Sequence, residues 1–242
     1  MSPTEPVHLL AHAKLTLSLR VVGVRVDGYH LIDAEMVSLD LADVLHVAGG
    51  LGNDLPEDNL VSRALAAVGR RAHVRLDKRI PAGAGLGGGS ADAAAILRWA
   101  GCEDVDVAVG LGADVGFCLL GGGHARVRGI GEVIDPLPHE DRVFTLLTPP
   151  LHVSTPAVYR AWDDLGGPTA GGPNDLEPAA LAVAPRLAGW RDRLRSATGV
   201  EPVLAGSGGT WFVEGAYPEV PGAVVARTRS DRPSGRPSGA LG

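Results

Sequence analysis

The stretch Pro81-Ala-Gly-Ala-Gly-Leu-Gly-Gly-Gly-Ser-Ala91 decides how this chain is interpreted. Its glycines, Gly83, Gly85 and Gly87–Gly89, remove Cβ atoms, so that backbone N–H groups can approach a bound anion closely. The residues that follow are rich in alanine and lack proline, which predicts a helix over 88–100. Because the N-terminal N–H groups and the dipole of that helix point into the loop, the stretch is predicted to hold a phosphate group.

Three interpretations of the stretch compete. The spacing Gly83-x-Gly85-x-x-Gly88 matches the dinucleotide fingerprint, but that pattern should follow the first strand of a parallel βαβ unit. Here several predicted strands of an antiparallel sheet come first. A Walker loop needs Lys-Ser or Lys-Thr after the last glycine, and Ser90-Ala91 stands there instead. A glycine-rich turn that only packs a helix against a sheet stays open as an alternative.

The composition is that of a globular protein with small-molecule ligands. Of 242 residues, 45% are hydrophobic and 21% are charged, which allows one large domain or two small ones. The formal net charge is -6 and the pI is about 5.7, so nothing draws the chain toward nucleic acid or an anionic membrane. An anionic substrate therefore needs a local positive site.

Cysteine usage and the N-terminus indicate a cytoplasmic protein. Cys102 and Cys118 stand in apolar surroundings without metal-ligand spacing, so both are predicted to be small buried hydrophobes in a reducing compartment. Residues 1–6 lack the basic flank and apolar core of a signal peptide, and no apolar run is long enough to span a bilayer.

Lysine is rare in this chain. Of 22 basic residues only Lys14 and Lys78 are lysines, and the rest are arginines. A lysine kept against such a bias can mark a place where a compact, strongly hydrated ammonium is needed. Chance explains either lysine equally well when it is taken alone.

The periodicity of the chain predicts an α+β fold, with strands first and helices mixed in later. Asp58 or Asn59 is predicted to cap the first helix, and a coil is expected from Thr228 onward. Strands are predicted at 13–22, 31–41, 44–47, 73–76, 115–120, 125–128, 132–134, 143–147, 203–204 and 211–213, and helices at 60–70, 88–100, 105–111, 156–163 and 185–197.

Five further segments accompany the glycine loop in a fixed order: Ala13–Leu17, Arg25–His30, Leu111–Val115, Thr155–Tyr159 and Gly206–Thr210. Together they resemble the GHMP kinase superfamily, collinearly from about Leu10 to Val213. The pairing of Asp27-Gly-Tyr-His30 with Leu86-Gly-Gly-Gly-Ser-Ala-Asp92 resembles one branch of it. That branch uses ATP to phosphorylate the 2-hydroxyl of 4-diphosphocytidyl-2-C-methyl-D-erythritol in the non-mevalonate isoprenoid precursor pathway.

The resemblance implies a GHMP kinase fold of two lobes. Residues 1–142 would form an ATP-binding domain like domain 2 of ribosomal protein S5, and 143–227 a shortened ferredoxin-like domain. Residues 228–242 would be a disordered tail. The implied cofactors are ATP and Mg²⁺. The implied partners are the cytidyl substrate and ATP, without nucleic acid or membrane, in a monomer or weak homodimer.

The resemblance also implies roles for individual residues. Lys14 and Asp114 match the family's catalytic pair, Lys14 stabilising the transferring phosphoryl group and Asp114 accepting or orienting the hydroxyl proton. Ser90 would contribute to the Mg²⁺ site. ATP would be held by Pro81, Ala82, Gly83, Ala84, Gly85, Leu86, Gly87, Gly88, Gly89, Ser90 and Ala91, the substrate by Thr16, Tyr29, His30, Thr155, Pro156 and Tyr159, and the site would be closed by the turn Gly206, Ser207 and Gly208.

The chain departs from the family pattern at several positions. Thr16 replaces a usual Asn, His12 a usual Pro, and Gly116 a usual Pro, which is expected to loosen the turn that carries Asp114. After Val213 little sequence is left for the usual terminal helix and strand. Two alternatives therefore stay open: a GHMP kinase for another small alcohol, and a nucleotide-binding homologue with impaired catalysis.

Overall fold

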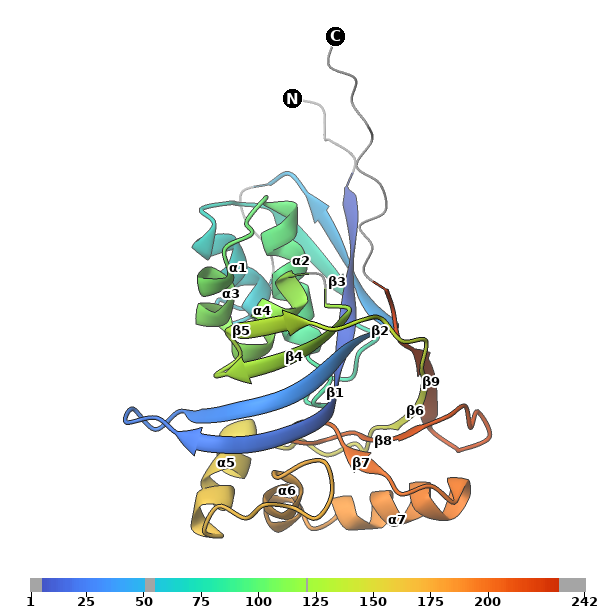
Figure 1. The fold of residues 1–242 in the computed structure, drawn as a ribbon. Helices are drawn as coiled ribbons and strands as arrows, with labels where there is room; N and C mark the ends of the chain where they lie inside the picture. The colour runs from blue at the N-terminus through green and yellow to red at the C-terminus, as the bar shows by residue number, and fades with distance from the viewer. Residues whose placement is uncertain (1–5, 51–54, 121, 231–242) are drawn as a thin grey trace.

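The computed structural model describes residues 6–50, 55–120 and 122–230, and in them two antiparallel sheets carry the fold (Figure 1). The first sheet has the order β1-β2-β4-β5, with β3 paired to β2. Its strands are β1 (Val7–Val24), β2 (His30–Ala48), β3 (His73–Asp77), β4 (His124–Gly129) and β5 (Val133–Pro136).

The two long antiparallel strands β1 and β2 form a hairpin that makes up most of this sheet. Val7 pairs with Val47 at one end and Val24 with His30 at the other, so the two strands predicted over 31–41 and 44–47 are one continuous strand. The register shifts between His12 and Lys14, and again between Thr16 and Ser18. Such bulges change the direction in which side chains point, and these two lie on either side of Lys14 and Thr16, which are predicted site residues.

Four helices gather on one side of the first sheet: α1 (Leu60–Ala67), α2 (Gly88–Trp99), α3 (Val105–Leu111) and α4 (Ala113–Leu119) (Figure 1). The side chain of Asn59 accepts a hydrogen bond from the N–H of Val61, which confirms one of the two predicted caps of α1. The alanines of α2 are buried, and their small size allows this helix to lie close to the sheet.

The strand predicted over 115–120 is wrong, because α4 occupies this segment. An apolar run that is buried on all sides has no alternation that would separate a strand from a short helix. Gly116 consequently lies inside a helix instead of in a turn. A Cβ at Gly116 would lie 3.1 Å from a methyl group of Val109, so this glycine lets α3 and α4 pack closely. Its expected place in a turn is wrong, and its expected loosening effect stays a prediction.

The second sheet has the order β7-β8-β6-β9 and carries three helices beneath it (Figure 1). Trp211 is fully buried in β8, and its indole N–H donates to the carbonyl of Leu187 at 3.0 Å. The elements are β6 (Val143–Leu147), β7 (Val203–Leu204), β8 (Trp211–Glu214), β9 (Ala223–Arg227), α5 (Thr155–Asp164), α6 (Glu177–Val183) and α7 (Leu187–Thr198).

Neither α6 nor β9 was predicted from the sequence. β9 pairs with β6 from Val143–Arg227 to Leu147–Ala223, so the expected loss of a terminal strand is wrong. Thr228, assigned to the tail, extends this pairing by donating its backbone N–H to the carbonyl of Arg142, whereas the N–H of Arg229 donates to the carbonyl of Ser38 in β2 of the first sheet. The rest of the predicted tail, 231–242, lies outside the described residues.

An apolar cluster joins the two sheets. Leu15 and Leu17 of β1 belong to the same buried cluster as Phe144, Leu146 and Phe212 of the second sheet. Ile80, Ala84 and Leu86, which flank or form the glycine loop, also belong to it. The loop is therefore anchored at the junction of the sheets. β6 begins next to the boundary expected at residue 142, and the division into two domains stays a prediction.

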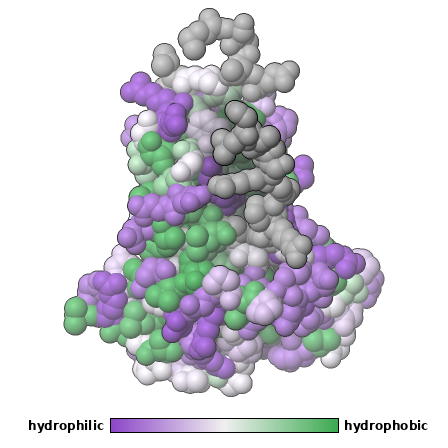
Figure 2. Space-filling model, turned by 45° about the horizontal axis from the view of Figure 1, so that its top comes forward, coloured by the Kyte–Doolittle hydropathy of each residue, from purple (hydrophilic) through white to green (hydrophobic). Residues whose placement is uncertain are grey.

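Hydrophobic surface on the face shown in Figure 2 forms a central area bordered by hydrophilic residues. Among the residues that the structure describes, no helix combines the length and the apolar character needed to cross a membrane. Cys118 is buried, as predicted, whereas Cys102 is only half-buried, so the prediction of burial is confirmed for one of the two cysteines.

Candidate active site

A cleft of about 1490 Å³ lies at the junction of the two sheets. It is lined by β1, by the start of β2, by the glycine loop, by the first turn of α4 and by α5. Most of the predicted site residues share it, namely Lys14, Thr16, Tyr29, His30, Pro81–Ser90, Asp114, Thr155, Pro156, Tyr159, Gly206 and Ser207. Ala91 and Gly208 do not line it.

Lys14 and Asp114 form an ion pair at the base of this cleft. The Nζ of Lys14 lies 3.1 Å from Oδ2 of Asp114, with 6% of the lysine side chain and 29% of the aspartate side chain exposed. Lys14 also donates to the hydroxyl of Thr16 at 3.0 Å. The ammonium is thus buried and held on two sides, while the carboxylate keeps an open side toward the cleft.

Gly87 brings the glycine loop against Lys14. It has a φ of 67°, a left-handed conformation that glycine adopts without strain, and α2 begins directly after it. A Cβ at this position would lie 2.6 Å from Cγ of Lys14. The backbone N–H of Lys14 donates to the carbonyl of Leu86 at 3.0 Å. The loop and the lysine are therefore fixed relative to each other.

The second glycine-rich turn, Gly206–Thr210, packs directly on the loop. A Cβ at Gly85 would lie 2.7 Å from the carbonyl oxygens of Ala205 and Gly208, and one at Gly209 would lie 2.6 Å from that of Gly83. Asn174 holds the turn from below, since its Nδ2 donates to the carbonyls of Leu204 and Gly206 at 2.8 and 2.7 Å. The turn therefore supports the loop, and its residues Gly206 and Ser207 also line the cleft. That the turn closes the site, as the family resemblance implies, stays a prediction.

A cluster of aromatic side chains lies at the other end of the cleft. The His30 ring lies 4.7 Å from that of Tyr159 and meets Trp162 edge-on at 5.5 Å. Nε2 of His30 lies 2.8 Å from a carboxylate oxygen of Asp163. Burial, and then the negative charge of Asp114, raise the pKa of the Tyr159 hydroxyl. Tyr29 also lines the cleft and is 61% exposed, and the guanidinium of Arg25 lies over its ring, 6.0 Å from the ring centroid.

Comparisons with known proteins place the chain in a family. Residues 59–122 match the model for the GHMP kinases N terminal domain. A 4-diphosphocytidyl-2-C-methyl-D-erythritol kinase of Paracoccus denitrificans is 39% identical over 90% of this chain and 90% of its own length. One of Pelotomaculum thermopropionicum is 39% identical over 91% of this chain and 93% of its own length.

This chain belongs to the 4-diphosphocytidyl-2-C-methyl-D-erythritol kinase family. A solved structure described as a 4-(cytidine 5'-diphospho)-2C-methyl-D-erythritol kinase superposes with a TM-score of 0.76 at 34% identity, covering 92% of this chain and 99% of that one. A mevalonate kinase from L. major superposes with a TM-score of 0.60 at 12% identity, over 95% of this chain and 98% of that one, which shows the shared fold alone.

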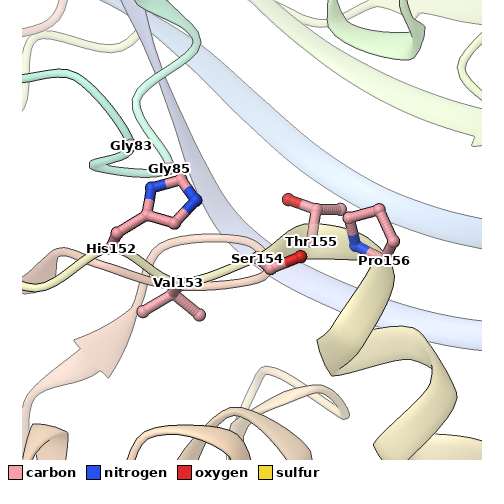
Figure 3. A pocket seen from close by; sticks show the side chains of 8 residues that line it. Gly83, Gly85, His152, Val153, Ser154, Thr155 and Pro156 are labelled. Atoms are coloured by element: carbon pink, nitrogen blue, oxygen red, sulfur yellow. The ribbon is translucent and has the colours of Figure 1, made fainter.

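In this member of the kinase family, a smaller pocket of about 270 Å³ opens beside the loop (Figure 3). The His152 ring lies against the loop at Gly83 and Gly85, while Thr155 and Pro156 begin α5 on the other side (Figure 3). The hydroxyl of Thr155 lies 2.7 Å from that of Ser207. This contact connects α5 to the supporting turn, so the two predicted segments meet.

Sequence reasoning missed several residues of this kinase site. Asn174 and Asp163 carried no signal, because each acts through a partner far away in the sequence. Lys78 did carry a sequence signal, because it is one of only two lysines in the chain, and in the structure it forms ion pairs with Asp43 and Asp92. Conversely, the N–H of Ala91 donates to the carbonyl of Gly87 within the helix, so it is not free for a phosphate.

Proposed function

We propose that this chain transfers the γ-phosphoryl group of ATP to the 2-hydroxyl of 4-diphosphocytidyl-2-C-methyl-D-erythritol. The observation that carries the proposal is the ion pair of Lys14 and Asp114 directly beside the glycine loop. Phosphoryl transfer depends mostly on positioning and on neutralising charge, and these are what a buried ammonium, a partly open carboxylate and a rigid loop supply.

Asp114 would receive or orient the proton of the attacking hydroxyl, because its carboxylate is the basic group that faces the cleft beside Lys14. Lys14 would stabilise the charge on the phosphoryl oxygens during transfer. Its two fixed partners, Asp114 and Thr16, keep the ammonium in place before the reaction, so little reorganisation is needed. Thr16 thereby keeps a role although it lacks the amide of the usual Asn.

The phosphates would lie against the backbone of Pro81–Ser90, at the N-terminus of α2. In phosphate-binding loops of other enzymes a Ser or Thr hydroxyl binds Mg²⁺ together with the substrate phosphates, and the hydroxyl of Ser90, which lines the cleft, would serve in the same way. When bound, the ion would neutralise phosphate charge. No group of three or more His, Cys, Asp or Glu side chains suited to a metal occurs in the described part of the chain.

The cytosine would lie among Tyr29, His30 and Tyr159. Aromatic faces stack on a base, and the His30 ring is already held between Tyr159 and Trp162 with one nitrogen on Asp163. Thr155 and Pro156 would line the same end of the cleft. We further propose that the enzyme acts in the cytoplasm as a monomer or weak homodimer.

A coupled ADP-release assay with ATP, Mg²⁺ and the cytidyl substrate tests the proposal. Turnover of the cytidyl substrate, with homoserine and mevalonate as negative controls, is the expected result. Turnover of one of these alcohols instead would favour a different GHMP kinase. ADP binding without turnover of any of them would favour a catalytically impaired homologue and overturn the proposal.

A further inference from the structure

Lys78 is the second of the two lysines, and the proposed reaction gives it no role. It lies after β3, on the short stem that leads to Pro81 and the glycine loop. Its Nζ donates to Oδ2 of Asp43 in β2 and, at 2.7 Å, to Oδ2 of Asp92 in α2. One ammonium thus joins the stem before the loop, the central strand beneath it and the helix after it.

Asp43 holds the same stem through its second oxygen. Oδ1 of this wholly buried residue accepts the backbone N–H groups of Arg79 at 2.5 Å and Ile80 at 2.8 Å. A Cβ at Gly88 would lie 3.3 Å from Oδ2 of Asp43, so the first residue of α2 packs on the same carboxylate. Both ends of the glycine loop therefore meet at Asp43.

Lys78, Asp43 and Asp92 form a charge cluster, and the ionisation of its carboxyl groups depends on Lys78. Burial raises the pKa of the Asp92 carboxyl to about 6 although the hydrogen bond from Lys78 opposes this. Burial also disfavours the charge on Lys78, but its hydrogen bonds to Asp43 and Asp92 outweigh burial and raise its pKa. Removing the ammonium would leave two carboxylates uncompensated beneath a loop suited to an anion, which is costly in a buried place.

We propose that Lys78 is a positioning residue of the phosphate loop, which bridges Asp43 and Asp92 and so holds the two ends of the loop at the separation that binds ATP phosphates. The inference rests on the proposed function in assigning ATP to this loop. Since the partners of Lys78 all support the loop, loss of the bridge is expected to weaken binding of the nucleotide and to spare binding of the phosphoryl acceptor.

The test compares Lys78→Met with the wild type in ADP affinity by calorimetry and in both KM values. We expect the ADP Kd and the KM for ATP to rise about tenfold or more, and the KM for the cytidyl substrate to change less than about threefold. Lys78→Arg, which keeps charge and donors, should restore most of the ADP affinity. Arg71→Met, which removes an exposed cation before β3, is the matched control and should bind ADP as the wild type does.

A double variant separates bridging from charge balance. Lys78→Met with Asp92→Asn restores the net charge of the cluster without the bridge, so weak ADP binding should persist. Backbone amides of residues 82–87 should exchange with deuterium faster in Lys78→Met, while those of β8 should not change. If Lys78→Met does not fold, Lys78→Gln takes its place in each comparison.

Three results would overturn the inference: an unchanged ADP Kd, an equal rise in both KM values, or recovery of ADP binding in the double variant. A wild-type chain that bound ADP but turned over no cytidyl substrate would overturn the proposed function instead. The ADP Kd of Lys78→Met would still decide the role of Lys78 in that case, because calorimetry requires no turnover.

Discussion

Replacing Lys14 by Met removes the ammonium from the candidate site while keeping an unbranched stem of similar length. The stem lies against Gly87, where a Cβ would come within 2.6 Å of Cγ, so a side chain of the same shape is needed to leave the loop undisturbed. The loss is then electrostatic. Thr16 loses a donor at 3.0 Å, and Asp114 loses a cation at 3.1 Å.

The size of the effect follows from this geometry. One preorganised donor aimed at developing charge is worth about 3–4 kcal/mol, so kcat should fall roughly 10²–10³-fold. The attraction between charges 3.1 Å apart is at most about 5 kcal/mol at an effective dielectric constant of ~20. Since 29% of the Asp114 side chain is exposed, water can replace much of that attraction, and the melting temperature should fall by only a few degrees.

The coupled ADP-release assay gives kcat and both KM values, and calorimetry gives the ADP Kd. The expected result for Lys14→Met is a large loss in kcat with an ADP Kd within about threefold of the wild type. Lys14→Arg should not rescue turnover, because the buried ammonium is held between Asp114 at 3.1 Å and Thr16 at 3.0 Å, and a larger planar guanidinium does not reproduce this geometry. Equal losses in kcat and ADP affinity would refute the reasoning and make Lys14 a nucleotide ligand.

Three further predictions concern the loop, the charge cluster and the base pocket. Gly209→Ala, whose Cβ would lie 2.6 Å from a carbonyl oxygen at a φ of 112°, should lower the free energy of urea unfolding by about 1–3 kcal/mol. The control Gly189→Ala lies in α7 with open space around it and should raise that free energy by up to about 1 kcal/mol, because alanine is the better helix former. The raised pKa of Asp92, about 6, means that the folded state holds its proton more tightly than the unfolded state, so stability is lost as pH rises from about 4 through 6. In Asp92→Asn this loss of unfolding free energy between about pH 4 and 6 should be smaller by up to about 3 kcal/mol. If the unfolding free energies of the two proteins changed with pH in parallel, the raised pKa of Asp92 would be contradicted. Tyr29→Ala and His30→Ala should raise the KM for the cytidyl substrate far more than that for ATP, and an unchanged KM would remove both from the base pocket.

Much of the fold could be predicted because local signals agreed with it. Helix α1 follows a predicted cap and helix α2 follows an alanine-rich run without proline, and α1, α2 and α3 were each predicted within a few residues. The prediction failed for the segment after Asp114, where burial on all sides removes the polar positions that distinguish a helix from a strand. It also missed β9, a short strand whose partner β6 lies far back in the chain.

The sequence by itself determined the glycine loop, the order of the motifs and hence the family and the pair Lys14 and Asp114. These depend only on residue type and on spacing along the chain, and both can be taken directly from the amino-acid sequence. Only the tertiary structure shows why Gly85 and Gly209 are glycine. The reason is that the backbone of the glycine loop and the backbone of the turn between β7 and β8 contact each other closely at these two positions. The tertiary structure likewise decided the surroundings of Lys78, because Asp43 and Asp92 become its partners only when β2, the loop stem and α2 are packed together.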